Sequence, residues 1–190
     1  MLTTRAEKEL LLHQRSRVIW FTGLPGAGKT TLGLALEKRL YQQGFLTQVL
    51  DGDIIRKGIN SNLGFTIQDR TENIRRIAEV SKLLVRNGVI TINCFISPTE
   101  AMRRMARQII GSADFIEIYV STPVEICQQR DPKGLYKNAH AGLIKNFTGV
   151  DAPFEPPTQA ALTIDTSQFT IAQSIEKIMT LILPEITYQL

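Results

Sequence analysis

The sequence predicts an α/β fold of three layers, in which a parallel five-stranded sheet carries helices on both faces. Short apolar segments rich in β-branched residues alternate with longer segments of helical period, which is typical of parallel sheets. The first apolar segment, residues 18–21, also runs directly into a glycine-rich loop and then a helix. With 190 residues, 43% of them hydrophobic, the chain can bury one core, so we expect a single domain over 1–190.

The expected elements follow from local composition and from their end signals. Gly44 closes the helix after the glycine-rich loop, whose apolar positions run from Leu32 to Leu40. Because ligands bind beyond the carboxyl ends of parallel strands, we expect this loop, Asp53 and Ser97 to share one cleft. The first sixteen residues are a charged N-terminal extension in which we expect a loose helix. The other strands are expected at 47–50, 89–96, 115–120 and 162–165, and the other helices at 66–87, 99–110, 123–129 and 170–183.

The glycine-rich loop matches the phosphate-binding pattern G-x-x-x-x-G-K-[ST] with Gly23-Leu24-Pro25-Gly26-Ala27-Gly28-Lys29-Thr30, and Thr31 follows it. Glycines let backbone N–H groups turn toward phosphate oxygens, and the helix N-terminus adds a positive dipole. We expect Lys29 to reach the β- and γ-phosphates and the Thr30 hydroxyl to sit on Mg²⁺. A plain glycine-rich turn does not require the Gly-Lys-Thr ending. The motif therefore predicts binding of ATP or GTP.

Charge, hydropathy and cysteine content limit the classes of protein to which the chain can belong. The net charge is +4 and the sequence pI is near 9.2, but no block of five like charges occurs, so we expect no nucleic-acid partner. No apolar stretch is long enough for a membrane span or a signal peptide. Cys94 and Cys127 lie far apart and without metal-ligand spacing, and we interpret them as buried free thiols. Together these features predict a cytoplasmic protein.

The segment after Thr66 carries a second signal. Thr66 to Asp69 reads as a capping box, and the stripe that continues through Ile74 and Ile77 also contains Arg70 and Asn73 one turn earlier. A core-facing arginine and asparagine need polar partners. They either brace a loop or bind a polar ligand in the cleft. The neighbouring cations Arg75 and Arg76 fall off the stripe, and we expect them to be solvated.

The region at about 130–150 shows no clean apolar period but contains glycines, cations, Tyr136 and Phe147. A segment of this length without an evident element is either a disordered loop or a functional lid. The cations and aromatic residues favour a mobile lid that closes on an anionic, aromatic substrate.

Several segments form one recognisable series along the chain: Phe21-Thr22-Gly23-Leu24, Gly26-Ala27-Gly28-Lys29-Thr30-Thr31, Leu50-Asp51-Gly52-Asp53, Asn62-Leu63-Gly64-Phe65, Asp69-Arg70, residues 72–80, Phe95-Ile96-Ser97-Pro98, residues 130–137 and residues 144–149. In this order the series resembles the adenylylsulfate kinase family. The resemblance extends over about 17–166, and only the phosphate loop is generic to kinases.

The resemblance implies a P-loop kinase that transfers the γ-phosphoryl group of ATP, with Mg²⁺, to the ribose 3′-hydroxyl of adenosine 5′-phosphosulfate. No acidic residue ends the expected strand at 89–96, and Asp53, just after the strand at 47–50, is the carboxylate nearest to the metal by topology. We therefore expect Asp53 to orient the acceptor hydroxyl and to help to place the metal, and Lys29 to contact the transferring group. In the matching positions, Lys133 is a lid lysine near that group, and Arg130 is a lid arginine over ATP. From the phosphate-loop motif we expect Thr30 to be the side chain that binds the metal. We also expect a homodimer.

The resemblance also assigns the acceptor side. Phe65 and Phe147 match the aromatic pair that sandwiches the substrate adenine. The positions that match contacts to phosphosulfate and ribose are Arg56, Arg70 and Asn73, so the resemblance favours ligand binding for the last two. Ile96 and Ser97 match residues that contact the substrate.

Ser97 leaves its role open. Its hydroxyl or backbone can contact substrate, it can cap the next helix, or it can accept a phosphoryl group covalently.

The chain departs from the family pattern at Pro25, Ile54, Asn93, His140 and Leu143. None of these is a residue assigned to chemistry, although the last two lie in the expected lid.

Two other functions compete with adenylylsulfate kinase: a kinase for another nucleoside or small alcohol, and a non-catalytic nucleotide-binding partner of a sulfate-activating complex.

Overall fold

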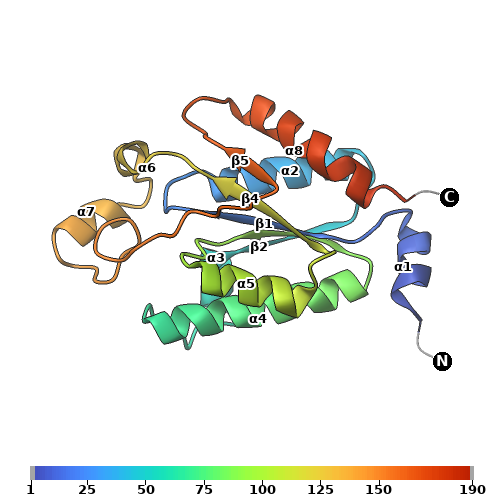
Figure 1. The fold of residues 1–190 in the computed structure, drawn as a ribbon, viewed down its shortest axis with the longest axis horizontal. Helices are drawn as coiled ribbons and strands as arrows, with labels where there is room; N and C mark the ends of the chain where they lie inside the picture. Colours follow the sequence, from blue (N-terminus) through green and yellow to red (C-terminus); the bar gives the residue numbers. More distant parts are fainter. Residues whose placement is uncertain (1–2, 189–190) are drawn as a thin grey trace.

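A computed structural model describes residues 3–188. Its centre is a sheet of five parallel strands in the order β2-β3-β1-β4-β5, which confirms the predicted sheet (Figure 1). The predicted strand starts agree with the structure to within one residue. The strands are β1 (Val18–Gly23), β2 (Thr47–Asp51), β3 (Ile90–Cys94), β4 (Phe115–Val120) and β5 (Leu162–Ile164).

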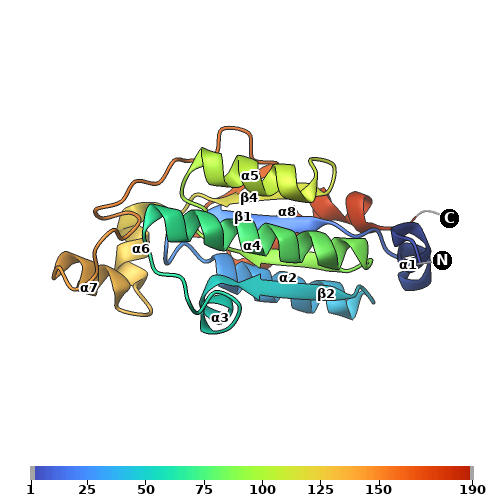
Figure 2. The same ribbon diagram turned by 90° about the horizontal axis from the view of Figure 1, so that it is seen from below.

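Helices cover both faces of the sheet, as expected. The helices α2 (Lys29–Gln42) and α8 (Ile171–Ile186) lie on one face, and α4 (Ile67–Arg86) and α5 (Glu100–Ile110) lie on the other (Figures 1 and 2). Each face therefore has its own apolar core. The strand β1 contributes to both, since Ile19 and Phe21 pack with α2 and α8 whereas Val18 and Trp20 pack with α4 and α5. This two-sided burial explains why the strand is apolar at every position from 18 to 21.

The predicted start of α4 is correct, but its capping box is incomplete. Thr66 Oγ1 accepts from the Asp69 N–H at 3.1 Å, whereas the Asp69 carboxylate accepts from the Thr66 hydroxyl at 2.8 Å instead of from the Thr66 backbone. The shorter aspartate side chain replaces the glutamate that a full box uses. Complete boxes occur instead at Thr4–Glu7, which starts α1 (Arg5–Leu12), and at Thr170–Gln173, which starts α8.

Several short helices escaped the sequence prediction or were only loosely expected. The N-terminal segment forms α1, a regular helix that Arg5 anchors to Asp114 at 2.6 Å. In contrast, α6 (Val124–Arg130) lies where the sequence predicted a helix. The helix α3 (Gly52–Lys57) starts directly after β2, with the Asp51 side chain as its cap. The helix α7 (Leu135–His140) lies inside the segment 130–150, which therefore is not purely irregular. Six residues do not complete two helical turns, so neither α3 nor α7 has a readable period.

The loops that follow the carboxyl ends of the strands lie at the end of the molecule that carries α6 and α7, opposite α1 and the two termini (Figure 1). A topological switch occurs at β1, whose neighbours are β3 and β4. Ligands bind at such a point in open α/β sheets. Between residues 3 and 188, no helix combines the length and apolar character that crossing a membrane requires.

Candidate active site

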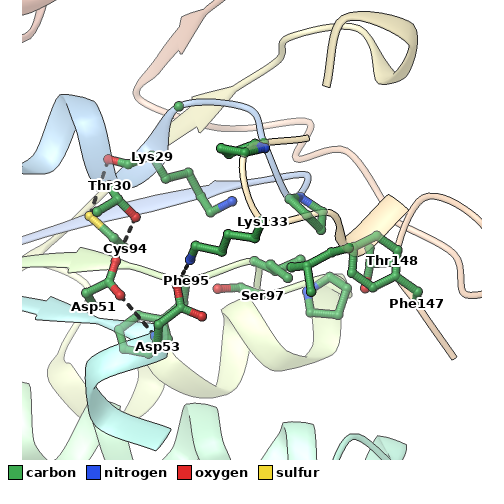
Figure 3. Close-up of a pocket in the computed structure, with 18 of the residues that line it drawn as sticks. Lys29, Thr30, Asp51, Asp53, Cys94, Phe95, Ser97, Lys133, Phe147 and Thr148 are labelled. Carbon is green, nitrogen blue, oxygen red and sulfur yellow. Dashed lines mark hydrogen bonds and ion pairs between the residues drawn. The ribbon is translucent and has the colours of Figure 1, made fainter. Parts of the chain in front are cut away.

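A cavity of about 1070 Å³ opens at the carboxyl edge of the sheet (Figure 3). Its walls come from the phosphate loop, the ends of β2 and β3, the start of α4 and the segment 130–150. Of the predicted loop residues, Gly23, Leu24 and Ala27 do not line it. The predicted residues that do line it are Pro25, Gly26, Gly28, Lys29, Thr30, Thr31, Asp53, Arg56, Phe65, Arg70, Asn73, Ile96, Ser97, Arg130, Lys133 and Phe147.

The phosphate loop owes its path to close backbone approaches. A Cβ at Gly23 would lie 2.5 Å from the Val120 carbonyl oxygen, and one at Gly26 would lie 2.9 Å from the Cys127 carbonyl oxygen. Both glycines also have positive φ angles. Only glycine fits these positions, so the loop is held tightly between β4 and α6.

Lys29 begins α2 and points back along the loop. Its Nζ donates to the carbonyl oxygens of Gly23 at 2.9 Å and Leu24 at 2.7 Å. The side chain is buried, and burial lowers its pKa from 10.5 to about 8. A poorly solvated ammonium group at the start of a helix is poised for an anionic ligand such as phosphate.

A carboxylate meets the loop at Thr30. The Thr30 hydroxyl donates to Asp51 Oδ2 at 2.6 Å, and Asp51 Oδ1 accepts from the Asp53 N–H at 2.9 Å (Figure 3). Sequence reasoning placed Asp53 nearest to the metal position, but the carboxylate in contact with Thr30 belongs to Asp51. Its position at the carboxyl end of β2 was the available signal. The Thr30 hydroxyl and Asp51 carboxylate supply the oxygen atoms that Mg²⁺ prefers.

Asp53 faces the middle of the cavity. Its Oδ2 forms an ion pair with Lys133 Nζ, which extends from the segment 130–150 between the phosphate loop and α3 (Figure 3). Both side chains are more than half exposed, at 59% and 55%. The pair is therefore accessible to ligand, and solvent weakens it.

The two predicted aromatic residues have different surroundings. Phe65 is 58% exposed, and the Arg56 guanidinium carbon lies 4.4 Å from its ring centre. Phe147 is only 7% exposed and meets the Tyr136 ring edge-on, with centres 5.1 Å apart. One ring is thus free to move onto a ligand, whereas the other is held in place by its neighbours.

Arg70 and Asn73 brace loops in this structure. Arg70 donates to the Phe65 and Asn146 carbonyl oxygens and, at 3.0 Å, to Thr148 Oγ1. Asn73 Oδ1 accepts from Asn60 at 2.9 Å. Both residues also line the cavity, so bracing does not exclude ligand binding.

Positive charge gathers near these groups. Burial lowers the pKa of Arg56 and Arg70, and the Arg56 charge lowers the pKa of Arg70 further. This side of the cavity therefore favours an anion.

The two neighbouring arginines of α4 differ in exposure. Arg75 is exposed as predicted, whereas Arg76, also predicted to be solvated, is part-buried and donates to Asn62 Oδ1 at 2.8 Å and to Glu72.

Ser97 lies at the cavity wall in a conformation that L-residues rarely adopt, with φ at +46°. Its hydroxyl accepts from Trp20 Nε1 at 2.9 Å, and its carbonyl oxygen accepts from buried Arg103 at 2.9 Å. Arg103 in turn forms an ion pair with Glu117 at 3.1 Å. The cap of α5 is Thr99, so the expectation that Ser97 caps this helix is wrong.

Arg130 closes the cavity near the phosphate loop. It donates to Thr166 Oγ1 at 2.6 Å and to the Thr166 carbonyl oxygen at 2.9 Å, and Thr166 Oγ1 donates to the Ala27 carbonyl oxygen at 2.8 Å. The segment after β5 thereby links the end of α6 to the phosphate loop. Sequence reasoning assigned no role to Thr166.

The two cysteines are free and buried, as predicted. Burial raises the pKa of Cys94 to about 12 and also raises that of Cys127, so both thiols are poor nucleophiles. Within residues 3–188, no group of three His, Cys, Asp or Glu side chains is arranged to hold a metal ion.

Comparison with known proteins identifies relatives over most of the chain. A family model described as "Adenylylsulphate kinase" matches residues 15–165. The adenylyl-sulfate kinase of Bacteroides thetaiotaomicron is 55% identical over 185 residues, covering 97% of this chain and 92% of that protein. The solved Mycobacterium tuberculosis APS kinase CysC, in complex with AMPPNP and APS, has a TM-score of 0.86 at 38% identity, covering 89% of this chain and 98% of that one. A hexameric APS kinase from Thiobacillus denitrificans gives a TM-score of 0.69 at 32% identity, covering 91% of this chain and 30% of that chain.

Proposed function

Because the chain belongs to the adenylylsulfate kinase family, we propose that it phosphorylates the ribose 3′-hydroxyl of adenosine 5′-phosphosulfate with ATP and Mg²⁺. The products are 3′-phosphoadenosine 5′-phosphosulfate and ADP. The observation that carries the proposal is the shared cavity. It joins the phosphate loop to a wall that bears Phe65, Arg56 and Arg70. This wall suits an acceptor that is both aromatic and anionic.

The donor nucleotide occupies the end formed by the phosphate loop. Lys29 leaves the loop carbonyl oxygens and contacts the β- and γ-phosphates, which restores its full charge. Thr30 and Asp51 hold Mg²⁺, which neutralises phosphate charge when it is bound. Arg130, fixed by Thr166, lies over the nucleotide.

The acceptor occupies the opposite end. Phe65 and Phe147 bind the two faces of its adenine, and stacking of this kind contributes about 1–3 kcal/mol per base. Arg56, Arg70 and Asn73 bind the phosphosulfate and ribose oxygens. Ile96 and Ser97 form the wall against which the ribose lies, and the contacts from Trp20 and Arg103 keep that wall rigid.

Asp53 and Lys133 act between the two nucleotides. Asp53 accepts the hydrogen bond of the 3′-hydroxyl and orients its oxygen toward the γ-phosphorus, and it takes the proton as transfer proceeds. Lys133, released from Asp53, neutralises charge on the transferring phosphoryl group. Phosphoryl transfer depends mainly on positioning and charge neutralisation, so a strong base is not required.

A coupled ADP-release assay tests this function. We expect turnover with adenosine 5′-phosphosulfate and much less with adenosine 5′-monophosphate, which lacks the sulfate that the arginines bind. A panel of nucleosides and sugar alcohols serves as the control. Turnover on one of these in preference to adenosine 5′-phosphosulfate would contradict the assignment, and binding without any turnover would leave a non-catalytic nucleotide-binding protein.

We further propose a single cytoplasmic kinase domain that acts as a homodimer with a mobile lid at about 130–150. One solved relative is a hexamer, although this chain covers only 30% of that chain. The exposed apolar side chains of Leu34 and Tyr41, two helical turns apart in α2, offer surface for such a contact. Light scattering over a concentration series tests the dimer, and a monomer at micromolar concentration would contradict it.

A further inference from the structure

We propose that Tyr136 is a positioning residue that couples occupation of the phosphate loop to the orientation of Phe147, so that the donor and acceptor nucleotides bind cooperatively. The proposal rests on the proposed function, because it needs Phe147 to stack on the acceptor base. Sequence reasoning assigned no role to Tyr136 beyond its place in the lid.

Tyr136 contacts the phosphate loop directly. It lies in α7, is 2% exposed, and donates from its hydroxyl to the Pro25 carbonyl oxygen at 3.0 Å. The two preceding carbonyl oxygens, of Gly23 and Leu24, accept from Lys29 in the free chain. A phosphate that draws Lys29 away changes the hydrogen bonding of adjacent peptide groups. Because the Tyr136 hydroxyl donates to the next carbonyl oxygen, that of Pro25, its position changes with that of the loop.

The same side chain fixes Phe147. The two rings meet edge-on at 86°, with their centres 5.1 Å apart. The backbone of Phe147 is already held, because Asp151 accepts from the Asn146 N–H at 2.7 Å and from the Phe147 N–H. With the backbone fixed, the tilt of the Phe147 ring depends on the Tyr136 ring against it.

The turn after Phe147 packs so closely on the phosphate loop and on Tyr136 that a displacement of the loop also moves this turn. A Cβ at Gly149 would lie 3.1 Å from Leu24 Cδ2 and 3.3 Å from the Tyr136 hydroxyl oxygen. The turn after Phe147 thus packs on both the phosphate loop and Tyr136. Close-packed groups transmit a displacement because no space is available to take it up. Burial also raises the pKa of Tyr136 above its usual value, so the hydroxyl stays a hydrogen-bond donor.

Tyr136→Phe tests the coupling, because it keeps the ring and removes only the hydroxyl. Calorimetry measures the affinity for adenosine 5′-phosphosulfate with and without saturating MgADP. In the unmodified protein we expect MgADP to tighten acceptor binding about tenfold, within the usual range of coupling between sites. In Tyr136→Phe we expect this ratio to fall below about twofold.

Tyr119→Phe is the matched control, since its ring stacks on Phe154 at 5.9 Å and does not line the cavity. It should keep the full ratio. A full ratio in Tyr136→Phe, or no coupling in the unmodified protein, would overturn the proposal. Failure of the unmodified protein to bind adenosine 5′-phosphosulfate would instead overturn the proposed function.

Hydrogen exchange in the unmodified protein provides a second test that needs no variant. MgADP alone, without acceptor, should slow amide exchange at 135–151 as well as in the phosphate loop. Slower exchange confined to the loop would overturn the proposal even if Tyr136→Phe did not fold.

Discussion

The phosphate loop and the acceptor wall of the cavity are built differently, although they face the same space. The loop is one continuous segment, residues 23–31, held between a buried strand and a helix. The acceptor wall gathers Phe65, Arg70, Ser97 and Phe147 from separate loops and helix ends. Arg70 and Thr148, which form a hydrogen bond, are 78 residues apart in sequence.

The two regions also differ in how fixed they are before ligand arrives. Lys29 is buried and bonded to its own loop, and Thr30 is bonded to the buried Asp51. In contrast, Phe65 and Lys133 are more than half exposed. The comparison teaches that the phosphate loop is held in place by its own contacts, whereas exposed side chains across the cavity are free to change position. Four predictions test this difference, from the largest expected effect to the smallest.

Lys29→Ala should cause the largest loss, because the donor side depends on one preorganised charge. We expect kcat to fall on the order of 10²- to 10³-fold, since electrostatic stabilisation dominates such sites. The fold should remain intact, because removal of a buried charge creates no unpaired charge in the core. Lys38→Ala, on the exposed face of α2, is the control. Near-normal turnover in folded Lys29→Ala would refute the assignment of the loop.

Asp53→Asn and Asp51→Asn separate acceptor chemistry from metal placement. We expect Asp53→Asn to lower kcat on the order of 10²-fold while nucleotide binding survives. Asp51→Asn should have a milder effect on kcat at saturating Mg²⁺ but should raise the Mg²⁺ concentration needed for half activity, because Asp51 contacts Thr30. Steady-state kinetics over a Mg²⁺ series measures both. A greater loss of kcat at Asp51 than at Asp53 would contradict these roles.

The two aromatic residues should give unequal results, because one is fixed and the other exposed. Phe65→Ala and Phe147→Ala should each weaken acceptor binding by about 1–3 kcal/mol and leave ATP affinity nearly unchanged. Phe147→Ala should also lower the free energy of unfolding by about 3 kcal/mol, as truncation of a buried phenylalanine does, whereas Phe65→Ala should not.

Calorimetry and thermal unfolding check these values, with Phe154→Ala as a control outside the cavity. Loss of ATP affinity in both variants would mean that the rings bind the other nucleotide.

The pH dependence of nucleotide binding should give the smallest effect. Burial lowers the pKa of Lys29 to about 8 in the free chain, and bound phosphate should raise it again. The complex then binds more protons than the free chain above about pH 7, so MgADP affinity should fall with rising pH, by about tenfold between pH 7 and pH 9. Below pH 7, Lys29 is charged in both states and the effect should vanish. Proton uptake that is equal at pH 7 and pH 9 would contradict this account.

The sequence by itself determined the sheet, the phosphate loop and the starts of the long helices. These features depend on local signals: the apolar run at 18–21, the G-x-x-x-x-G-K-[ST] spacing, and the threonine cap at Thr66. The family resemblance added residues on the acceptor side, and every residue predicted there lies on the wall of the cavity. Their roles in binding remain predictions.

Only the tertiary structure decided which side chains meet. It placed Asp51 rather than Asp53 against Thr30, and it used Arg70 to hold the turn at Thr148. It also revealed the short helices α3 and α7, which contain too few residues for a readable period. The physical reason is that hydrogen bonds and ring contacts act over a few ångströms in space, and the chain brings distant segments within that range only when its two cores close.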